Sequence, residues 1–140
     1  MAEATSWADT AVATAGAGHI RTDDGELAIA LPSPLAPRGR GLTPEQLLAA
    51  AFASCLHHAA VEAAKEITDE AHTVEVRAEA RLSRDTEGRY RADIAATVGS
   101  VGLTRDQLAQ LAERADGLWP FSGRGGQFSL TVSPAQNSHR

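Results

Sequence analysis

Apolar and polar residues alternate strictly in the middle of the chain. Between residues 73 and 82, the odd positions are polar or charged: Thr73, Glu75, Arg77, Glu79 and Arg81. The even positions are apolar: Val74, Val76, Ala78, Ala80 and Leu82. This period of two predicts a half-buried β-strand. The pattern returns from Tyr90 to Val98, after a polar turn that contains Glu87 and Gly88. The two segments therefore predict an antiparallel hairpin.

A capped helical pattern precedes this hairpin. Thr43 suits the N-cap, Pro44 suits the first helical position, and Gln46 completes a capping box. The sequence predicts a helix that begins here and ends near Glu66. Its many alanines leave it slim on nearly every side, which favours a central, buried helix that another backbone can approach closely.

A second capped helix follows the hairpin. Thr104 and Gln107 repeat the spacing of the capping box. Leu108, Leu111 and Ala115 then form an apolar stripe, which is typical of an amphipathic helix.

Shorter segments complete the predicted order of elements. We expect strands at residues 10–16 and 26–31, a turn at Asp23-Asp24-Gly25, a loop over 32–41, a turn over 119–123 and a closing strand over 127–132. The tail from about residue 133 is expected to be flexible. Together these elements predict one α+β domain over residues 1–140.

Composition narrows the class of protein. Hydrophobic residues make up 43% and charged residues 22% of the chain, as in ordinary globular domains. The 13 basic residues are scattered and the formal net charge is −5, which argues against a nucleic-acid partner. No apolar run approaches the roughly 20 residues that span a bilayer, and the N-terminus lacks a secretory pattern. We therefore expect no membrane partner. A single cysteine excludes an internal disulfide, which fits a reducing compartment, and we expect a cytoplasmic protein.

Candidate chemistry gathers around that single cysteine. Cys55 lies in the first predicted helix, and His58 follows three positions later, so the two side chains share a helix face. An imidazolium there would favour the reactive thiolate. Alternatively, His57 and His58 are only polar residues at the edge of the helix. A zinc site is not expected, because Cys55 and His58 supply two ligands and no second pair accompanies them.

Glu45 has two interpretations. It is a carboxylate in the first turn, where the helix dipole favours negative charge. It also lies ten positions before Cys55, which is about 15 Å along a continuous helix. The two residues can therefore share a pocket only through a bridging group, a break in the helix or a second subunit.

Several segments of the sequence resemble those of a known protein family. The segment Thr43-Pro44-Glu45-Gln46-Leu47, followed by small residues up to Cys55, resembles the reactive-cysteine helix of the OsmC/Ohr family. These are the osmotically inducible and organic-hydroperoxide-resistance proteins. Residues 11–18 and 22–27 resemble the first hairpin of the family, and Trp119-Pro120-Phe121-Ser122 resembles its Cys-Pro-Tyr-Ser segment.

The resemblance implies a fold and an activity. The fold would be α+β, with antiparallel sheets around two central helices in an intertwined homodimer, and with the sites at the dimer interface. The activity would be reduction of organic hydroperoxides by a cysteine that becomes a sulfenic acid. In the family, a second cysteine then forms a disulfide, and a dithiol reductant restores both.

This sequence departs from the family at two positions. Trp119 stands where the family has its second cysteine, so any sulfenic acid on Cys55 would need an external thiol. The arginine that stabilises the thiolate in the family falls at Gly16 or His19 here, with Arg21 nearby. Histidine carries charge only when protonated, so activation would be weaker and pH-dependent.

Trp119 has two interpretations. Trp119 either fills space in the core or forms an aromatic wall beside Cys55, with Phe121 and Phe52, that accepts an apolar ligand.

Three functions are compatible with the sequence. The first is a one-cysteine hydroperoxide reductase with antioxidant action, in which Cys55, Glu45 and His19 are catalytic, no cofactor is bound and an external thiol is the reductant. The second is a non-peroxidase member of the same fold that binds a small apolar ligand at the dimer-interface pocket. The third is a purely structural role, for which the sequence has no positive signal.

Overall fold

The computed structural model describes residues 10–16, 18–30, 41–69, 73–118, 123–125 and 128–135. The chain divides into two compact units, residues 1–44 and 45–140. The prediction of one domain over residues 1–140 therefore stays a prediction. In the described part, two helices and seven strands form an α+β structure with a three-stranded and a four-stranded sheet.

The N-terminal unit is a small antiparallel sheet. Its strands are β1 (Ala13–Gly16), β2 (His19–Thr22) and β3 (Ala28–Ala30), in the order β1-β2-β3. The predicted strands near β1 and β3 are confirmed in shortened form, whereas β2 was not predicted. The predicted loop over residues 32–41 lies almost wholly outside the described residues.

The turn between β2 and β3 is closed by Asp24. Its Oδ1 accepts hydrogen bonds from Thr22 Oγ1 at 2.6 Å and from the Glu26 N–H at 3.0 Å. Gly25 has a φ of 79°, which a glycine adopts without steric cost. The predicted Asp23-Asp24-Gly25 turn is therefore confirmed, with Asp24 as the residue that fixes it.

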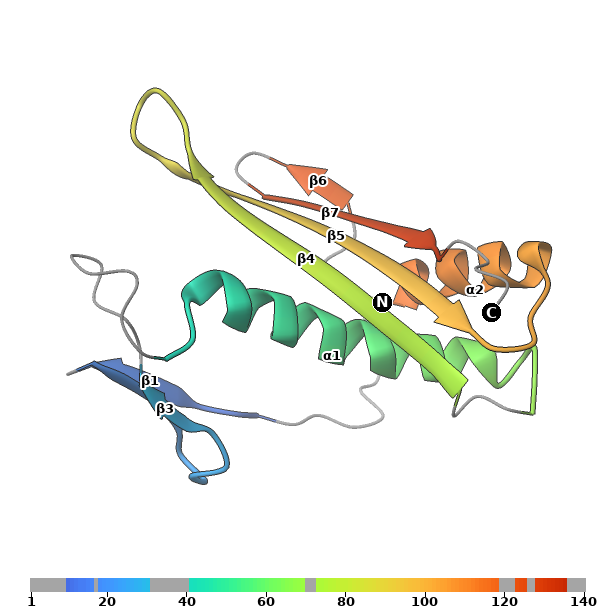
Figure 1. Ribbon diagram of the computed structural model, residues 1–140, viewed down its shortest axis with the longest axis horizontal. Coiled ribbons are helices and arrows are strands. Elements are labelled where there is room, and N and C mark those ends of the chain that lie inside the picture. The colour runs from blue at the N-terminus through green and yellow to red at the C-terminus, as the bar shows by residue number, and fades with distance from the viewer. Residues whose placement is uncertain are drawn as a thin grey trace, which may run out of the picture. The chain divides into compact units, whose positions relative to one another are not determined.

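A four-stranded sheet forms the centre of the C-terminal unit (Figure 1). Its strands are β4 (Val74–Arg84), β5 (Tyr90–Ser100), β6 (Gly123–Gly125) and β7 (Phe128–Pro134), in the order β4-β5-β7-β6. The predicted hairpin is confirmed, because Val76 pairs with Val98 and Ala80 pairs with Ile94 in an antiparallel register. The polar residues between them are exposed or half-buried on the opposite face.

One pair of strands breaks the antiparallel expectation. β5 and β7 run parallel, which requires a crossover connection between them. The helix α2 (Arg105–Leu118) lies in that connection, and short β6 precedes β7 as an antiparallel edge strand. β7 also extends to Pro134, and the Ala135 N–H donates to the Val98 carbonyl at 2.9 Å. Residues 133–135 therefore belong to the sheet, which corrects the expectation of a tail that frays from residue 133.

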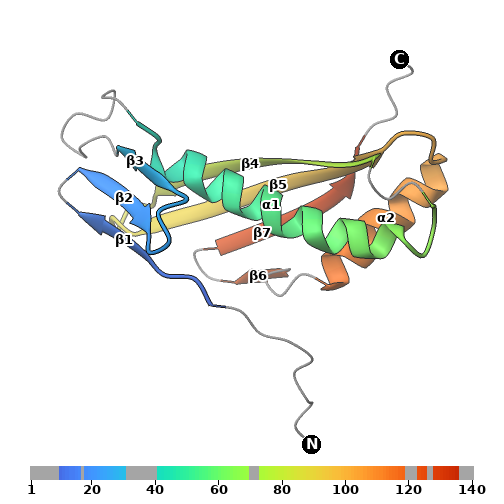
Figure 2. The same ribbon diagram turned by 90° about the horizontal axis from the view of Figure 1, so that it is seen from below.

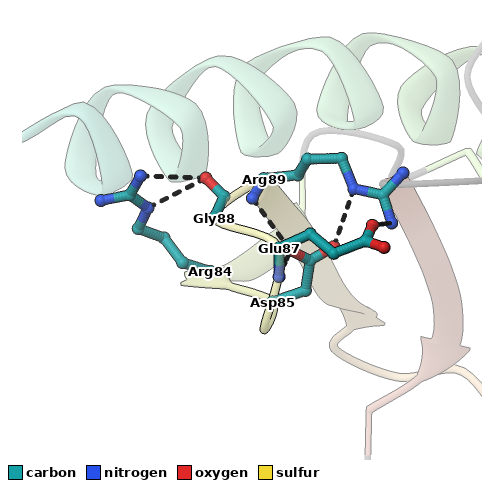
Figure 3. A network of polar contacts seen from close by, with 5 residues as sticks. All are labelled: Arg84, Asp85, Glu87, Gly88 and Arg89. Atoms are coloured by element: carbon teal, nitrogen blue, oxygen red, sulfur yellow. Dashed lines mark hydrogen bonds and ion pairs between the residues drawn. The ribbon is translucent and has the colours of Figure 1, made fainter.

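The tip of the β4–β5 hairpin is held by its own side chains (Figure 3). Asp85 Oδ1 accepts from the backbone N–H groups of Glu87 and Arg89, each at 2.9 Å. The Arg84 guanidinium donates twice to the Gly88 carbonyl, at 3.1 and 2.9 Å. These bonds satisfy the polar backbone of the turn where the two strands separate.

Both helices bury residues in one core on the same face of this sheet. The capping box of α2 is confirmed: the Thr104 N–H donates to Gln107 Oε1 at 2.9 Å, and the Gln107 N–H donates to Thr104 Oγ1 at 3.1 Å. The predicted apolar stripe of α2 is also confirmed, because Leu108, Leu111 and Ala115 are all buried. Among the described residues, fourteen make up the core: Leu56, Ala60, Ala63, Ala64, Val74, Ile94, Ala96, Val98, Leu103, Leu108, Leu111, Ala112, Ala115 and Leu130.

The first predicted helix is α1 (Pro44–Ala64), which crosses strands β4, β5 and β7 (Figure 2). Only its C-terminal half is buried in the chain by itself, at Leu56, Ala60, Ala63 and Ala64. Most residues before Leu56 are exposed or half-buried. Burial on nearly every side, as expected from the alanines, is therefore absent from the first half of α1 in a single chain.

By length and composition, α1 is also apolar enough to cross a membrane. This corrects the expectation that no segment approaches that length. The signal is weak, because a core helix meets the same criterion and the four buried residues of α1 join the core of this unit.

Asp93 links two neighbouring strands. Its Oδ1 accepts a hydrogen bond from Ser129 Oγ at 2.6 Å, which joins β5 to β7, and its Oδ2 accepts from Arg91 Nε at 3.1 Å. The Ser129 hydrogen bond is the main cause that holds the pKa of Asp93 below its ordinary value of 3.8, and the charges of Arg91 and Arg81 add to it.

A carboxyl group with a lowered pKa in the folded state stabilises the fold above its unfolded pKa, and this stabilisation is lost as the pH falls through the folded pKa. We expect Asp93→Asn to lower the free energy of unfolding at neutral pH, and the difference from wild type to shrink below about pH 4. Urea unfolding at several pH values measures this, with exposed Glu113→Gln as the control. A gap that stays constant down to strongly acid pH would contradict the role of the Asp93 charge.

Candidate functional site

Cys55 lies on the exposed side of α1 in the chain by itself. The next residue, Leu56, points into the core, and Ala60 and Ala63 continue the buried side one and two turns later. Because successive residues turn by about 100°, Cys55 is at the edge of the buried side and its thiol faces outward. A thiol in this position is open to a small reagent.

His58 shares the exposed side with Cys55. It is exposed, three positions after Cys55, and therefore about 60° around the helix and about 4.5 Å along it. His57 is half-buried and points about 160° away from Cys55. The predicted shared face is thus confirmed for His58, and the two adjacent histidines have different surroundings.

Glu45 does not meet Cys55 within one chain. The helix is continuous from Pro44 to Ala64, so the predicted separation of about 15 Å along the axis holds. Around the axis, half-buried Glu45 lies within about 20° of Leu56, on the side that faces the sheet. A break in the helix is therefore no longer an option, and a bridging group or a second subunit remains.

Glu45 instead lines a cavity of about 580 Å³ that is open to solvent, with residues of three strands. The other lining residues come from β4, β5 and β7: Glu79, Ala80, Arg81, Leu82, Asp93, Ile94, Ala95, Ser129 and Thr131. Ionisable groups of both signs are present, and Arg81 lies opposite Asp93 in the register of β4 and β5. The volume is in the range of small-molecule sites.

Sequence reasoning missed the strand residues of this cavity. Arg81 and Asp93 were visible only as members of the polar face of the predicted hairpin. The hairpin register would have placed them opposite each other, but nothing local in the sequence joins them to Ser129 or Glu45.

His19 and Arg21 lie on β2 of the N-terminal unit. They are two residues apart on one strand, so their side chains leave the same face, and both residues are exposed. Their membership of a site around Cys55 stays a prediction.

The predicted aromatic wall is only partly described. Phe52 is half-buried and packs against the core of the C-terminal unit. Trp119 and Phe121 lie outside the described residues. Among the described residues, no group of three or more His, Cys, Asp or Glu side chains is placed to hold a metal ion.

Comparison with known proteins identifies relatives of this chain. The family model described as OsmC-like protein matches residues 37–124. Organic hydroperoxide resistance protein OhrB of Bacillus subtilis is 32% identical over 109 residues, which cover 76% of this chain and 79% of OhrB.

Solved structures agree with the sequence match. An organic hydroperoxide resistance protein OsmC from Legionella pneumophila superposes with a TM-score of 0.76 at 27% identity, over 95% of this chain and all of that chain. The crystal structure of Bacillus subtilis OhrB gives a TM-score of 0.71 at 25% identity, over 92% of this chain and 98% of that chain. The resemblance and the fold class predicted from the sequence are thereby confirmed, and the chain belongs to the OsmC-like family.

Proposed function

We propose that this protein reduces organic hydroperoxides with Cys55 as its only redox cysteine, and that an external thiol restores it. The observation that carries the proposal is an exposed thiol on the long helix of an OsmC-like chain. The names of its relatives, which are organic hydroperoxide resistance proteins, support the substrate class. The biological role would be protection against oxidative stress.

The proposed cycle balances with one cysteine. The Cys55 thiolate attacks the terminal oxygen of the hydroperoxide, so that an S–O bond forms, the O–O bond breaks and an alkoxide leaves. The sulfur is oxidised to a sulfenic acid, and the alkoxide takes a proton to become an alcohol. An external thiol then condenses with the sulfenic acid, releasing water and forming a mixed disulfide with Cys55. A second thiol attacks the external sulfur of this mixed disulfide, so that a disulfide of the two external thiols forms and Cys55 leaves as the thiolate.

A homodimer is part of the same proposal. The uncovered first half of α1 carries apolar residues such as Leu47, Leu48 and Phe52, which a single chain leaves partly open to water. A second copy packed along α1 would cover them, since burying apolar surface is favourable. It would also let Glu45 of one copy approach Cys55 of the other, which one continuous helix forbids. We expect such a dimer in the cytoplasm, with no bound cofactor and with neither nucleic acid nor a membrane as a partner.

The test of this function is a turnover assay on the wild-type protein. An alkyl hydroperoxide, such as cumene hydroperoxide, is supplied with a monothiol or a dithiol, and loss of peroxide is followed over time. We expect several turnovers per Cys55 with at least one thiol. If no thiol supports turnover, the proposal is wrong, and saturable binding of an apolar ligand unchanged in Cys55→Ala would favour a binding protein.

A further inference from the structure

Six of the residues that line the cavity of about 580 Å³ form a compact array on the four-stranded sheet. The registers of β4, β5 and β7 place them in two adjacent rows. One row is Glu79, Ala95 and Thr131, and the other is Arg81, Asp93 and Ser129. Because residues two positions apart on a strand leave the same face, all six side chains share one face of the sheet. Regular structure therefore fixes their spacing.

The middle of the array is small and apolar. Ala95 lies between Glu79 on β4 and Thr131 on β7, and its side chain is a single methyl group. Neighbouring strands are about 4.8 Å apart, so the backbones on either side of Ala95 are separated by about 10 Å. A small molecule can lie across Ala95 and reach side chains of both β4 and β7.

Arg81 brings a cation without a direct partner to this cavity. Among the described residues, its guanidinium forms no hydrogen bond or ion pair, although Asp93 lies opposite it and Glu79 shares its face of β4. Asp93 is already engaged, because its two oxygens accept from Ser129 Oγ at 2.6 Å and from Arg91 Nε at 3.1 Å. A guanidinium presents N–H donors in a planar fork that matches a carboxylate. Arg81 is therefore available to a carboxylate of a ligand.

The acidic residues of the cavity disfavour a simple anion. Glu79 and Glu45 line it as well, and in the described part of the chain neither carboxylate forms a hydrogen bond or an ion pair. With Asp93 they place three negative groups around one positive group. A simple anion would meet all three negative charges, and a simple cation would leave Arg81 without a partner. A ligand with both charges complements the cavity best.

We propose that this cavity binds a small zwitterion with an apolar body, of the kind that a dipeptide forms. The ligand carboxylate pairs with Arg81, its ammonium group pairs with Glu79, and its apolar part lies over Ala95. Arg81 and Glu79 are about 7 Å apart along β4, and two residues of extended peptide span about the same length. Cys55 is not among the lining residues, so the inference goes beyond the proposed peroxide chemistry and does not depend on it.

The test is an NMR titration of the wild-type protein with L-alanyl-L-leucine and two matched compounds. N-acetyl-alanyl-leucine lacks the ammonium group, and alanyl-leucinamide lacks the carboxylate. We expect saturable shifts of the Ala95 and Thr131 amide signals with the free dipeptide. Each blocked compound should bind about three- to fivefold more weakly, as expected for the loss of one exposed ion pair.

Variants assign each charge of the ligand to one residue. Arg81→Gln should weaken binding of the free dipeptide about three- to fivefold and leave binding of alanyl-leucinamide unchanged, because that compound has no carboxylate. Glu79→Gln should weaken the free dipeptide similarly and leave the N-acetyl compound unchanged. Arg77→Gln is the matched control, since it makes the same charge change on the same face of β4 outside the cavity lining. It should bind all three compounds as wild type does.

The absence of saturable shifts with the free dipeptide would overturn the proposal. Equal affinity for the dipeptide and its amide, or equal binding curves for Arg81→Gln and Arg77→Gln, would overturn it too. Cys55→Ser should bind the dipeptide as wild type does. Loss of peroxide turnover and loss of dipeptide binding are therefore separate results.

Discussion

Replacing Cys55 with serine is expected to abolish thiol-dependent turnover of an organic hydroperoxide. The change exchanges one atom on the exposed side of α1, so the core formed by Leu56 and Ala60 stays intact. A serine hydroxyl is not appreciably ionised at neutral pH and does not cycle through a sulfenic acid. With no second cysteine in the chain, no other thiol can take over. Peroxide consumption should fall to the rate of the thiol alone.

The matched control is Ser54→Ala, which alters the exposed residue next to Cys55. It should retain turnover within about twofold, as expected for a surface substitution with little effect on the fold. Far-UV circular dichroism of both variants shows whether α1 is preserved. If Cys55→Ser keeps the wild-type rate, the peroxide chemistry belongs to another group and the assignment of Cys55 is wrong.

Leu111→Ala is expected to lower the free energy of unfolding by about 2–5 kcal/mol. Leu111 is 0% exposed and belongs to the core between α2 and the four-stranded sheet. Truncation removes buried apolar contacts and leaves a cavity that the β5–α2–β7 crossover can close only in part. Urea unfolding followed by circular dichroism measures the loss.

Leu118→Ala is the matched control, because Leu118 ends the same helix and is 50% exposed. Its effect should stay within about 0.5 kcal/mol. A loss of similar size for both leucines would contradict the placement of the apolar stripe of α2 against the sheet.

The elements that repeat one period over many residues were predictable from the sequence. Apolar and polar residues alternate over most of β4 and β5. Thr43 and Thr104 are N-cap residues that mark where the two helices begin. In these segments the local pattern and the tertiary environment favour the same structure.

The elements that depend on distant pairing were not predictable. β2 has only four residues, His19–Thr22, and lies between glycines that indicate turns. Its strand geometry comes from pairing with β1 and β3 on either side. The parallel pairing of β5 and β7 likewise follows from the path of the chain through α2. The local sequence of a strand does not indicate whether it pairs parallel or antiparallel with its neighbour.

The candidate site divides in the same way. Helix spacing alone showed that Cys55 and His58 share a face and that Glu45 lies about 15 Å away along the axis. The cavity that Glu45 lines with Arg81 and Asp93 could not be predicted, because its walls come from segments brought together only by folding.

The central claim is that Cys55 reacts with organic hydroperoxides and is restored by an external thiol. Its most direct test is the intact mass of the protein after one equivalent of cumene hydroperoxide, with dimedone added to trap a sulfenic acid. The account predicts one dimedone adduct on the peptide that contains Cys55 and, without dimedone, a return to the original mass on addition of thiol. An unmodified Cys55 after treatment with excess hydroperoxide would contradict it.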